Sequence, residues 1–192
     1  MSEVAKKSVT YQDVLDAPPG VVAEIIDGNL SLQPRPAPAH AETCFQVAGS
    51  LTSLGGRGGE TSRWRLLYEP QCQLGDNVLV PDIAGWRVDR MPKTPRQAVI
   101  TLPPDWVCEI LSPSTVKMDR TSKMRIYNKY RVSHVWLVDP LNRLLEVYQL
   151  AGDFWQRILA VTGDERLHIP PFEVLEIDLA RWWVDLEEDT DG

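Results

Sequence analysis

Two acidic residues, each enclosed by an apolar run, constrain this chain more than any other feature of its sequence. Asp82 lies in the segment 78–84, and Glu109 lies in the segment 106–111. Both segments are predicted to be buried strands, where an unpaired carboxylate is costly because burial removes its hydration. A carboxylate in such a place is usually paired with a cation, protonated or bound to a metal. The sequence therefore predicts a charged site inside the fold.

The segment that follows Glu109 is strongly basic. A helix is predicted over residues 119–131, and this stretch with the residues just before it sets six basic side chains against Asp119: Lys117, Arg120, Lys123, Arg125, Lys129 and Arg131. Magnesium in proteins typically binds one or two carboxylates together with phosphate oxygens of a substrate. Asp82 and Glu109 could supply those carboxylates if their strands are neighbours, and the backbone carbonyl of Ile110 could add a third oxygen. The pattern suggests a metal site for a phosphate ester, with basic side chains for the neighbouring phosphates.

Lys123 shares a helical face with Asp119 and Tyr127, because the three are spaced i, i+4 and i+8. It could point at the metal site and position or deprotonate an attacking water. Each assignment also has an ordinary structural alternative. Asp82 could simply close a strand, Glu109 could belong to a buried ion pair, Lys123 could pair with Asp119 alone, and the basic helix face could be solvated.

The rest of the pattern predicts a mixture of strands and helices. A short helix is predicted over residues 10–16, a hairpin over 22–32, and a helix that begins at Pro38 and ends at Gly55-Gly56. The apolar face of that second helix is predicted to consist of Ala41, Phe45, Ala48 and Leu51, with Val47 and Leu54 beside it. Further strands are predicted over 65–68, 71–74, 134–138, 144–150 and 155–161, with a surface connection over 92–104.

The connections between these elements indicate the fold class. The Glu109 strand, the basic helix and the strand at 135–138 make one β-α-β step, while the other connections are hairpin-like. This predicts an α/β protein with a mixed central sheet flanked by helices, rather than a doubly wound parallel sheet. The 192 residues suit one domain, placed at 10–184 between an N-terminal arm (1–9) and an acidic tail (185–192).

Charge is unevenly distributed along the chain. Of the net charge of −7, the stretch 176–192 accounts for −6, with seven acidic side chains and one basic. The body of the chain is therefore nearly neutral, and the acidic end is expected to be a solvated terminus.

The three cysteines, Cys44, Cys72 and Cys108, form no CxxC pair. We expect them to be reduced and buried, which points to the cytoplasm. No signal-like stretch is present, and no apolar run approaches the roughly 20 residues that span a membrane.

Many of these residues occur in an order that resembles a known family. The order is Glu24-Ile25-Ile26-Asp27-Gly28, a helix with Pro38, His40 and Glu42, then Val80-Pro81-Asp82-Ile83, Glu109-Ile110-Leu111-Ser112-Pro113-Ser114-Thr115, Asp119, Lys123, Tyr127 and Val135-Trp136-Leu137-Val138-Asp139-Pro140. Over roughly residues 10–176 the chain resembles the Uma-type restriction endonuclease domains of the PD-(D/E)xK nuclease superfamily.

The resemblance implies a restriction-endonuclease-like fold and hydrolysis of DNA phosphodiester bonds with Mg²⁺, or with Mn²⁺ in its place. It implies that Asp82 and Glu109 bind the metal and that Glu42 is a further carboxylate near it. Lys117, Arg120 and Tyr127 are then expected to contact the substrate. Cutting both strands of a duplex usually requires two active sites, so a homodimer is also expected.

Two positions depart from the superfamily pattern. The residue two after Glu109 should be the catalytic lysine, and here it is Leu111, so the resemblance implies that Lys123 has taken over from the following helix. Arg131 stands where relatives usually have the glycine that ends this helix. Two alternative functions stay open: a non-catalytic module that binds DNA or protein on a nuclease scaffold, and a metal-dependent hydrolase of a smaller phosphate ester.

Overall fold

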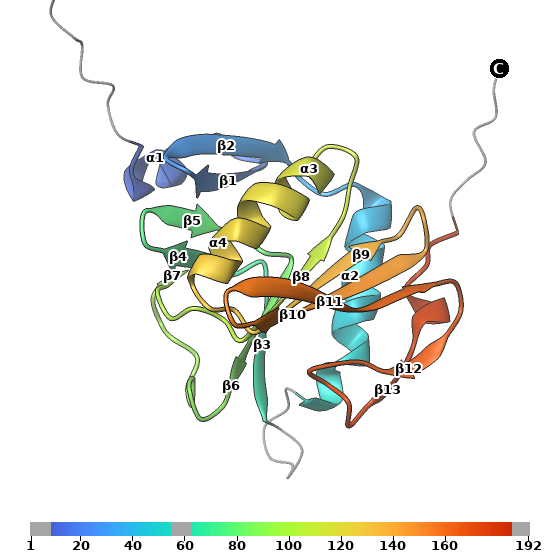
Figure 1. The fold of residues 1–192 in the computed structure, drawn as a ribbon. Helices are drawn as coiled ribbons and strands as arrows, with labels where there is room; N and C mark the ends of the chain where they lie inside the picture. Colours follow the sequence, from blue (N-terminus) through green and yellow to red (C-terminus); the bar gives the residue numbers. More distant parts are fainter. Residues whose placement is uncertain (1–8, 55–62, 186–192) are drawn as a thin grey trace, which may run out of the picture.

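A mixed sheet of six strands forms the centre of the computed structural model, which describes residues 9–54 and 63–185 (Figure 1). The strands lie in the order β11-β10-β9-β8-β6-β3, and β8 and β9 run parallel while the other neighbours are antiparallel. Their bounds are β3 Trp64–Tyr68, β6 Ile83–Arg87, β8 Trp106–Ile110, β9 His134–Asp139, β10 Leu144–Ala151 and β11 Phe154–Thr162. The predicted mixed sheet and its β-α-β step are confirmed.

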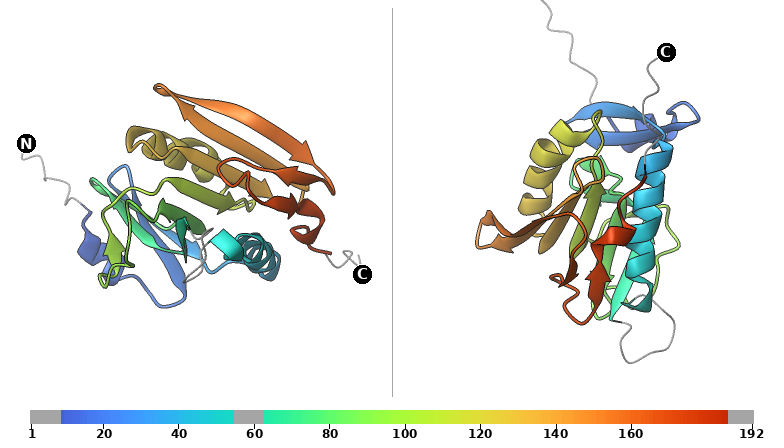
Figure 2. Two further views of the ribbon diagram at one scale, coloured as in Figure 1. Left: turned by 90° about the horizontal axis from the view of Figure 1, so that it is seen from below. Right: turned by 90° about the vertical axis from the view of Figure 1, so that its right-hand side faces the viewer.

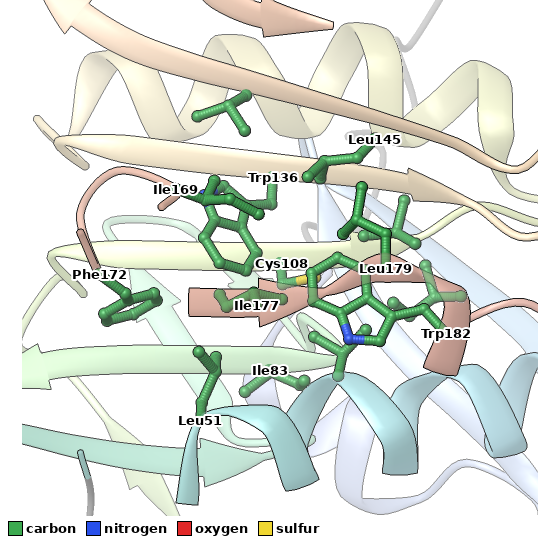
Figure 3. Close-up of a cluster of buried hydrophobic side chains, with 14 of the residues drawn as sticks. Leu51, Ile83, Cys108, Trp136, Leu145, Ile169, Phe172, Ile177, Leu179 and Trp182 are labelled. Atoms are coloured by element: carbon green, nitrogen blue, oxygen red, sulfur yellow. The ribbon is translucent and has the colours of Figure 1, made fainter. Parts of the chain in front are cut away.

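Helices cover both faces of this sheet. Helix α2 (Pro38–Ser50) lies on one face, and the continuous run of α3 (Val116–Met118), η2 (Asp119–Lys123) and α4 (Met124–Lys129) lies on the other (Figure 2). Strand β8 is therefore buried on both sides. Its residues Trp106, Cys108 and Ile110 join the apolar cluster under α2, which Figure 3 shows together with Leu51 and Trp182. The alternate residues of β8 face α4, and this alternation points Glu109 toward the basic helix.

Two smaller sheets flank the central one. The first has the order β2-β1-β5-β4-β7, with bounds β1 Val21–Ile26, β2 Asn29–Pro34, β4 Gln71–Leu74, β5 Asn77–Leu79 and β7 Val99–Ile100. The second pairs β12 (Arg166–His168) with β13 (Glu176–Asp178). The short helices are α1 Tyr11–Leu15, η1 Thr52–Leu54 and η3 Leu179–Arg181. The predicted hairpin is confirmed as β1–β2, and both turn residues, Asp27 and Gly28, have the positive φ that a tight two-residue turn requires.

Three details of the sequence interpretation were wrong. The segment 78–84 is not one strand, because β5 belongs to a flanking sheet and β6 to the central one, with Pro81 and Asp82 at the crossing between them. The connection over 92–104 contains the short strand β7. On α2, the predicted Ala48 and the Leu51 that follows the helix pack in the core with Cys44 and Val47. Ala41 and Phe45 are exposed instead, Phe45 by 75%. The sequence alone does not show which side of α2 faces the core, because α2 has few apolar residues. A stripe that includes Ala41 and Phe45 fits the helical spacing as well as the stripe that is buried.

Other expectations hold or lie outside the described residues. All three cysteines are free and buried. Among the described residues, no helix is long and apolar enough to cross a membrane. Most of the predicted N-terminal arm, the Gly55-Gly56 helix stop and nearly all of the acidic tail lie outside the part of the chain that the structure describes.

The end of α4 explains the unusual Arg131. The Val132 N–H donates to the Tyr127 carbonyl (3.0 Å) and the Arg131 N–H donates to the Asn128 carbonyl (3.0 Å), which is the Schellman pattern of helix termination. Arg131 accordingly has a φ of 61°, in the left-handed region that disfavours a side chain with a Cβ.

We expect Arg131→Gly to be more stable than Arg131→Ala by about 1 kcal/mol in urea unfolding, because glycine relieves the left-handed strain. Alanine is the matched control, since both variants lose the exposed ion pair of Arg131 with Asp153. An alanine variant as stable as the glycine variant would show that this position is not strained.

Candidate active site

An open cavity of about 340 Å³ lies where the end of β8 and the approach to β6 meet the first turn of α2, the β1–β2 hairpin and η2. Its wall contains five carboxylates, two fixed cations and one histidine: Glu24, Glu69, Asp82, Glu109, Asp119, Arg35, Lys123 and His40. Negative charge is therefore in excess, which suits a cavity that receives a cation.

Asp82 is fixed at the entrance to β6 by contacts with three other elements. One oxygen, Oδ2, accepts the backbone N–H of Ile110 (2.7 Å) and lies 3.3 Å from Nε2 of His40. The backbone carbonyl of Asp82 accepts the N–H of Glu69 (3.0 Å). Because β6 and β8 pair Ile83 with Cys108, the residues next in register are Asp82 and Glu109. The two carboxylates of the sequence analysis therefore meet at one end of the central sheet.

Glu109 is buried and lies against the helix that follows it. Its side chain accepts a hydrogen bond from the hydroxyl of Tyr127 (2.5 Å), and Nζ of Lys123 lies 3.4 Å from its Oε1. The same ammonium lies 3.3 Å from Oε1 of Glu24 and 3.2 Å from Oδ1 of Asp119. Lys123 is thus enclosed by three carboxylates from three different elements, and it is itself only 5% exposed.

This enclosure determines the charge of Lys123. Burial disfavours the ammonium, but the nearby carboxylates, above all Glu109, outweigh burial and raise the pKa of Lys123 well above its usual value. Burial also raises the pKa of Glu109 well above 4.5, and the charge of Lys123 opposes that rise. Lys123 is therefore a permanent cation at neutral pH, which suits hydrogen-bond donation and not proton abstraction.

The local helix geometry brings Asp119 and Lys123 to the site together. Both belong to η2, a π-helical turn inserted between α3 and α4. Such wide turns in helices frequently occur at functional sites. The predicted i, i+4 pairing of Lys123 with Asp119 is present, and so is the contact with Glu109.

Four ionisable residues of the cavity wall were given no role from the sequence: Glu24, Arg35, His40 and Glu69. Glu24 lies on β1 and its Oε1 also accepts the backbone N–H of Val80 (2.8 Å). It could have been found, because it too is an acid within an apolar run, 21–26. His40 lies in the first turn of α2 and its Nδ1 is buried without a hydrogen-bond partner in the described part of the chain.

Four predicted site residues do not line the cavity. Glu42 is exposed, because it lies two residues after His40 and hence on nearly the opposite side of α2. Lys117 is exposed outside the cavity, and Arg120 turns to the sheet and pairs with Glu146 of β10. Tyr127 is fully buried and contacts Glu109, so it supports the site from beneath and has no surface for a substrate.

Replacing Lys123 by methionine should produce a pH-dependent loss of stability. Without the ammonium, the folded-state pKa of Glu109 rises further, so above about pH 4.5 the folded protein binds more protons than the unfolded chain. The free energy of unfolding of the variant should then fall as the pH rises, and near neutral pH the variant should be about 3–5 kcal/mol less stable than wild type. At about pH 3 the gap should narrow, because Glu109 and Asp119 are then largely protonated in both states.

The measurement is urea unfolding in EDTA at a series of pH values, with Lys129→Met on the exposed side of the same helix as the control. A deficit that is the same at acidic and neutral pH would contradict the electrostatic origin of the effect.

Comparison with known proteins places the chain in a family. A solved structure described as a putative nuclease belonging to DUF820, from Anabaena variabilis ATCC 29413, superposes with a TM-score of 0.73 at 24% identity, covering 91% of this chain and 97% of that one. That likeness shows a shared nuclease-like fold. No curated protein matches the sequence. The family model described as Uma2, putative restriction endonuclease, matches residues 10–180. Since the match spans nearly the whole domain, this protein belongs to the Uma2 family.

Proposed function

We propose that this protein is a Mg²⁺-dependent DNA endonuclease, with Mn²⁺ able to replace Mg²⁺. The observation that supports this most directly is that Asp82, just before β6, and Glu109, on the neighbouring β8, line one open cavity together with Lys123, which lies 3.4 Å from Glu109. Family membership and the nuclease-like fold support the same reaction class.

The donor set of the cavity fits a hard cation. Among the described residues, no group of three or more His, Cys, Asp or Glu side chains is arranged to hold a metal. Mg²⁺ does not need such a group, because it usually keeps several waters and takes one or two protein carboxylates. Asp82, Glu109 and the backbone carbonyl of Ile110 would hold it. When bound, the cation would make a coordinated water more acidic and stabilise charge on a phosphate.

The protein's own groups orient this donor set. The Ile110 N–H holds one oxygen of Asp82, and the hydroxyl of Tyr127 holds one oxygen of Glu109. Lys123 would contribute a fixed positive charge and a hydrogen-bond donor. It would replace the lysine that the superfamily pattern places on the strand, at position 111. Glu42 has no part in this proposal, since it faces away from the cavity.

A non-catalytic DNA- or protein-binding module is the second candidate. The observation that favours it is the full engagement of Lys123 by three carboxylates, which restrains it from contacting a substrate.

For the endonuclease we also propose a homodimer, because two active sites can cut both strands of a duplex.

Asp82→Asn should reduce cleavage of plasmid and single-stranded DNA in Mg²⁺ or Mn²⁺ by at least about 100-fold, because the amide removes the negative charge that a cation requires. Glu42→Gln is the matched control and should cut like wild type. Calorimetric titration with Mn²⁺ gives a second readout, in which Asp82→Asn should bind much more weakly.

Metal binding by wild type without any cleavage would favour the non-catalytic module. Equal cleavage by wild type and Asp82→Asn would exclude Asp82 from the chemistry.

A further inference from the structure

The proposed reaction leaves open which side chain meets the substrate's phosphates. The basic helix was the sequence-based candidate, but its cations are largely engaged elsewhere. Of its six cations, Lys123 alone belongs to the cavity wall, and Lys123 is buried. Arg120, Arg125 and Arg131 pair with acids outside that wall, and the exposed Lys117 and Lys129 also lie outside it. A phosphate that approaches the acidic cavity therefore needs a cation from another element.

Arg35 supplies that cation. It lies between β2 and α2, its side chain is 62% exposed, and it belongs to the cavity wall. Within the described residues of that wall, it is the exposed side chain that carries fixed positive charge. Nη1 of Arg35 lies 3.1 Å from Oε2 of Glu69, in a monodentate ion pair whose guanidinium side is open to solvent, and such pairs contribute little to stability. Exchanging this carboxylate for a phosphate would therefore cost little, and guanidinium binds phosphate in a geometrically matched way.

An exposed aromatic ring lies next to this ion pair. Tyr68 ends β3 and is 56% exposed, and its hydroxyl donates to the other oxygen of Glu69 (3.2 Å). Burial and then Glu69 raise the pKa of Tyr68 to about 12, so the hydroxyl remains a donor. Tyr68 pairs across the sheet with Ile83, the residue after Asp82. The hydroxyl of Tyr68 contacts Glu69, whose own backbone N–H contacts Asp82, and the charge of Asp82 also contributes to the raised pKa of Tyr68, so this side chain lies near Asp82.

Glu69 ties both groups to the acidic site. Its side chain holds Arg35 and Tyr68, and its backbone N–H donates to the carbonyl of Asp82 (3.0 Å). Glu69 makes these contacts with a backbone φ of 42°, which a residue other than glycine rarely adopts. The acidic groups themselves are recessed, because Glu109 is 2% exposed and the side chain of Asp82 is 15% exposed. A scissile phosphate must therefore enter the cavity, and a flexible strand can do so more easily than a stacked duplex.

We propose that Arg35 and Tyr68 form a nucleotide-binding rim, in which Arg35 contacts a phosphate and Tyr68 stacks on an unpaired base. The preferred substrate is then a single-stranded or locally unpaired DNA segment, because a base must leave the duplex stack to lie on an aromatic side chain. This inference rests on the proposed function, since it specifies the substrate of the same site.

The test of stacking uses a fluorescein-labelled 15-nucleotide single strand and the same strand in a duplex, with binding followed by anisotropy in Ca²⁺ and strand integrity checked on a gel. Tyr68→Ala should weaken single-strand binding by about tenfold and duplex binding by less than about twofold, whereas Tyr68→Phe should bind like wild type. A central 2-aminopurine should be quenched by wild type and by Tyr68→Phe but not by Tyr68→Ala. Phe154→Ala, which removes a 79% exposed ring on β11, is the matched control and should change nothing.

The test of Arg35 uses the salt dependence of binding. Arg35→Gln should weaken both forms of DNA and lower the slope of log affinity against log salt by about one. Arg131→Gln is the control, because Arg131 is also an exposed arginine in a monodentate ion pair, with Asp153, and lies outside the cavity wall.

The outcomes separate this inference from the proposed function. If wild type binds single strand and duplex equally well, or if Tyr68→Ala binds like wild type, the proposed nucleotide-binding rim is wrong even if metal-dependent cleavage is intact. A wild type that binds neither Mn²⁺ nor DNA would overturn both.

Discussion

The burial of Lys123 among Glu24, Glu109 and Asp119 is the interaction on which the rest of this structure depends. Each carboxylate comes from a different element, β1, β8 and η2, and each would be costly to bury without the shared cation. The position of the helix over the sheet, the docking of the N-terminal hairpin and the orientation of Glu109 are therefore coupled. Few other arrangements would satisfy all four charges at once.

Most of the central fold could be predicted from the sequence, because β8 and the helix after it carry strong local signals. A run that is apolar on both faces and holds one acid identifies Glu109, and i, i+4 spacing connects Lys123 to Asp119. The division of 78–84 could not be predicted, because one continuous apolar run does not reveal where the chain passes from one sheet to another. The buried side of α2 could not be predicted either, because the helix has few apolar residues and one of them, Phe45, is exposed.

The site was predictable only in part, for a reason that concerns side-chain direction. A sequence gives the charge of a helix but not the partner that each cation finds, and Arg120, Arg125 and Arg131 all find acids outside the cavity. Conversely, His40 and Arg35 come from segments whose patterns are ordinary. They acquire importance only when the flanking sheet and α2 meet the edge of the central sheet.

The hydrogen bond from the Val80 amide to Glu24 has a consequence for how the molecule opens. This bond joins the flanking sheet to the connection that presents Asp82, and the same Glu24 oxygen faces Lys123. Detachment of the N-terminal hairpin would therefore remove one of the three carboxylates around Lys123 and free the Val80 amide two residues before Asp82 at the same time. Deuterium uptake at this single amide would report, in the native protein, how often the flanking sheet separates from the wall of the cavity.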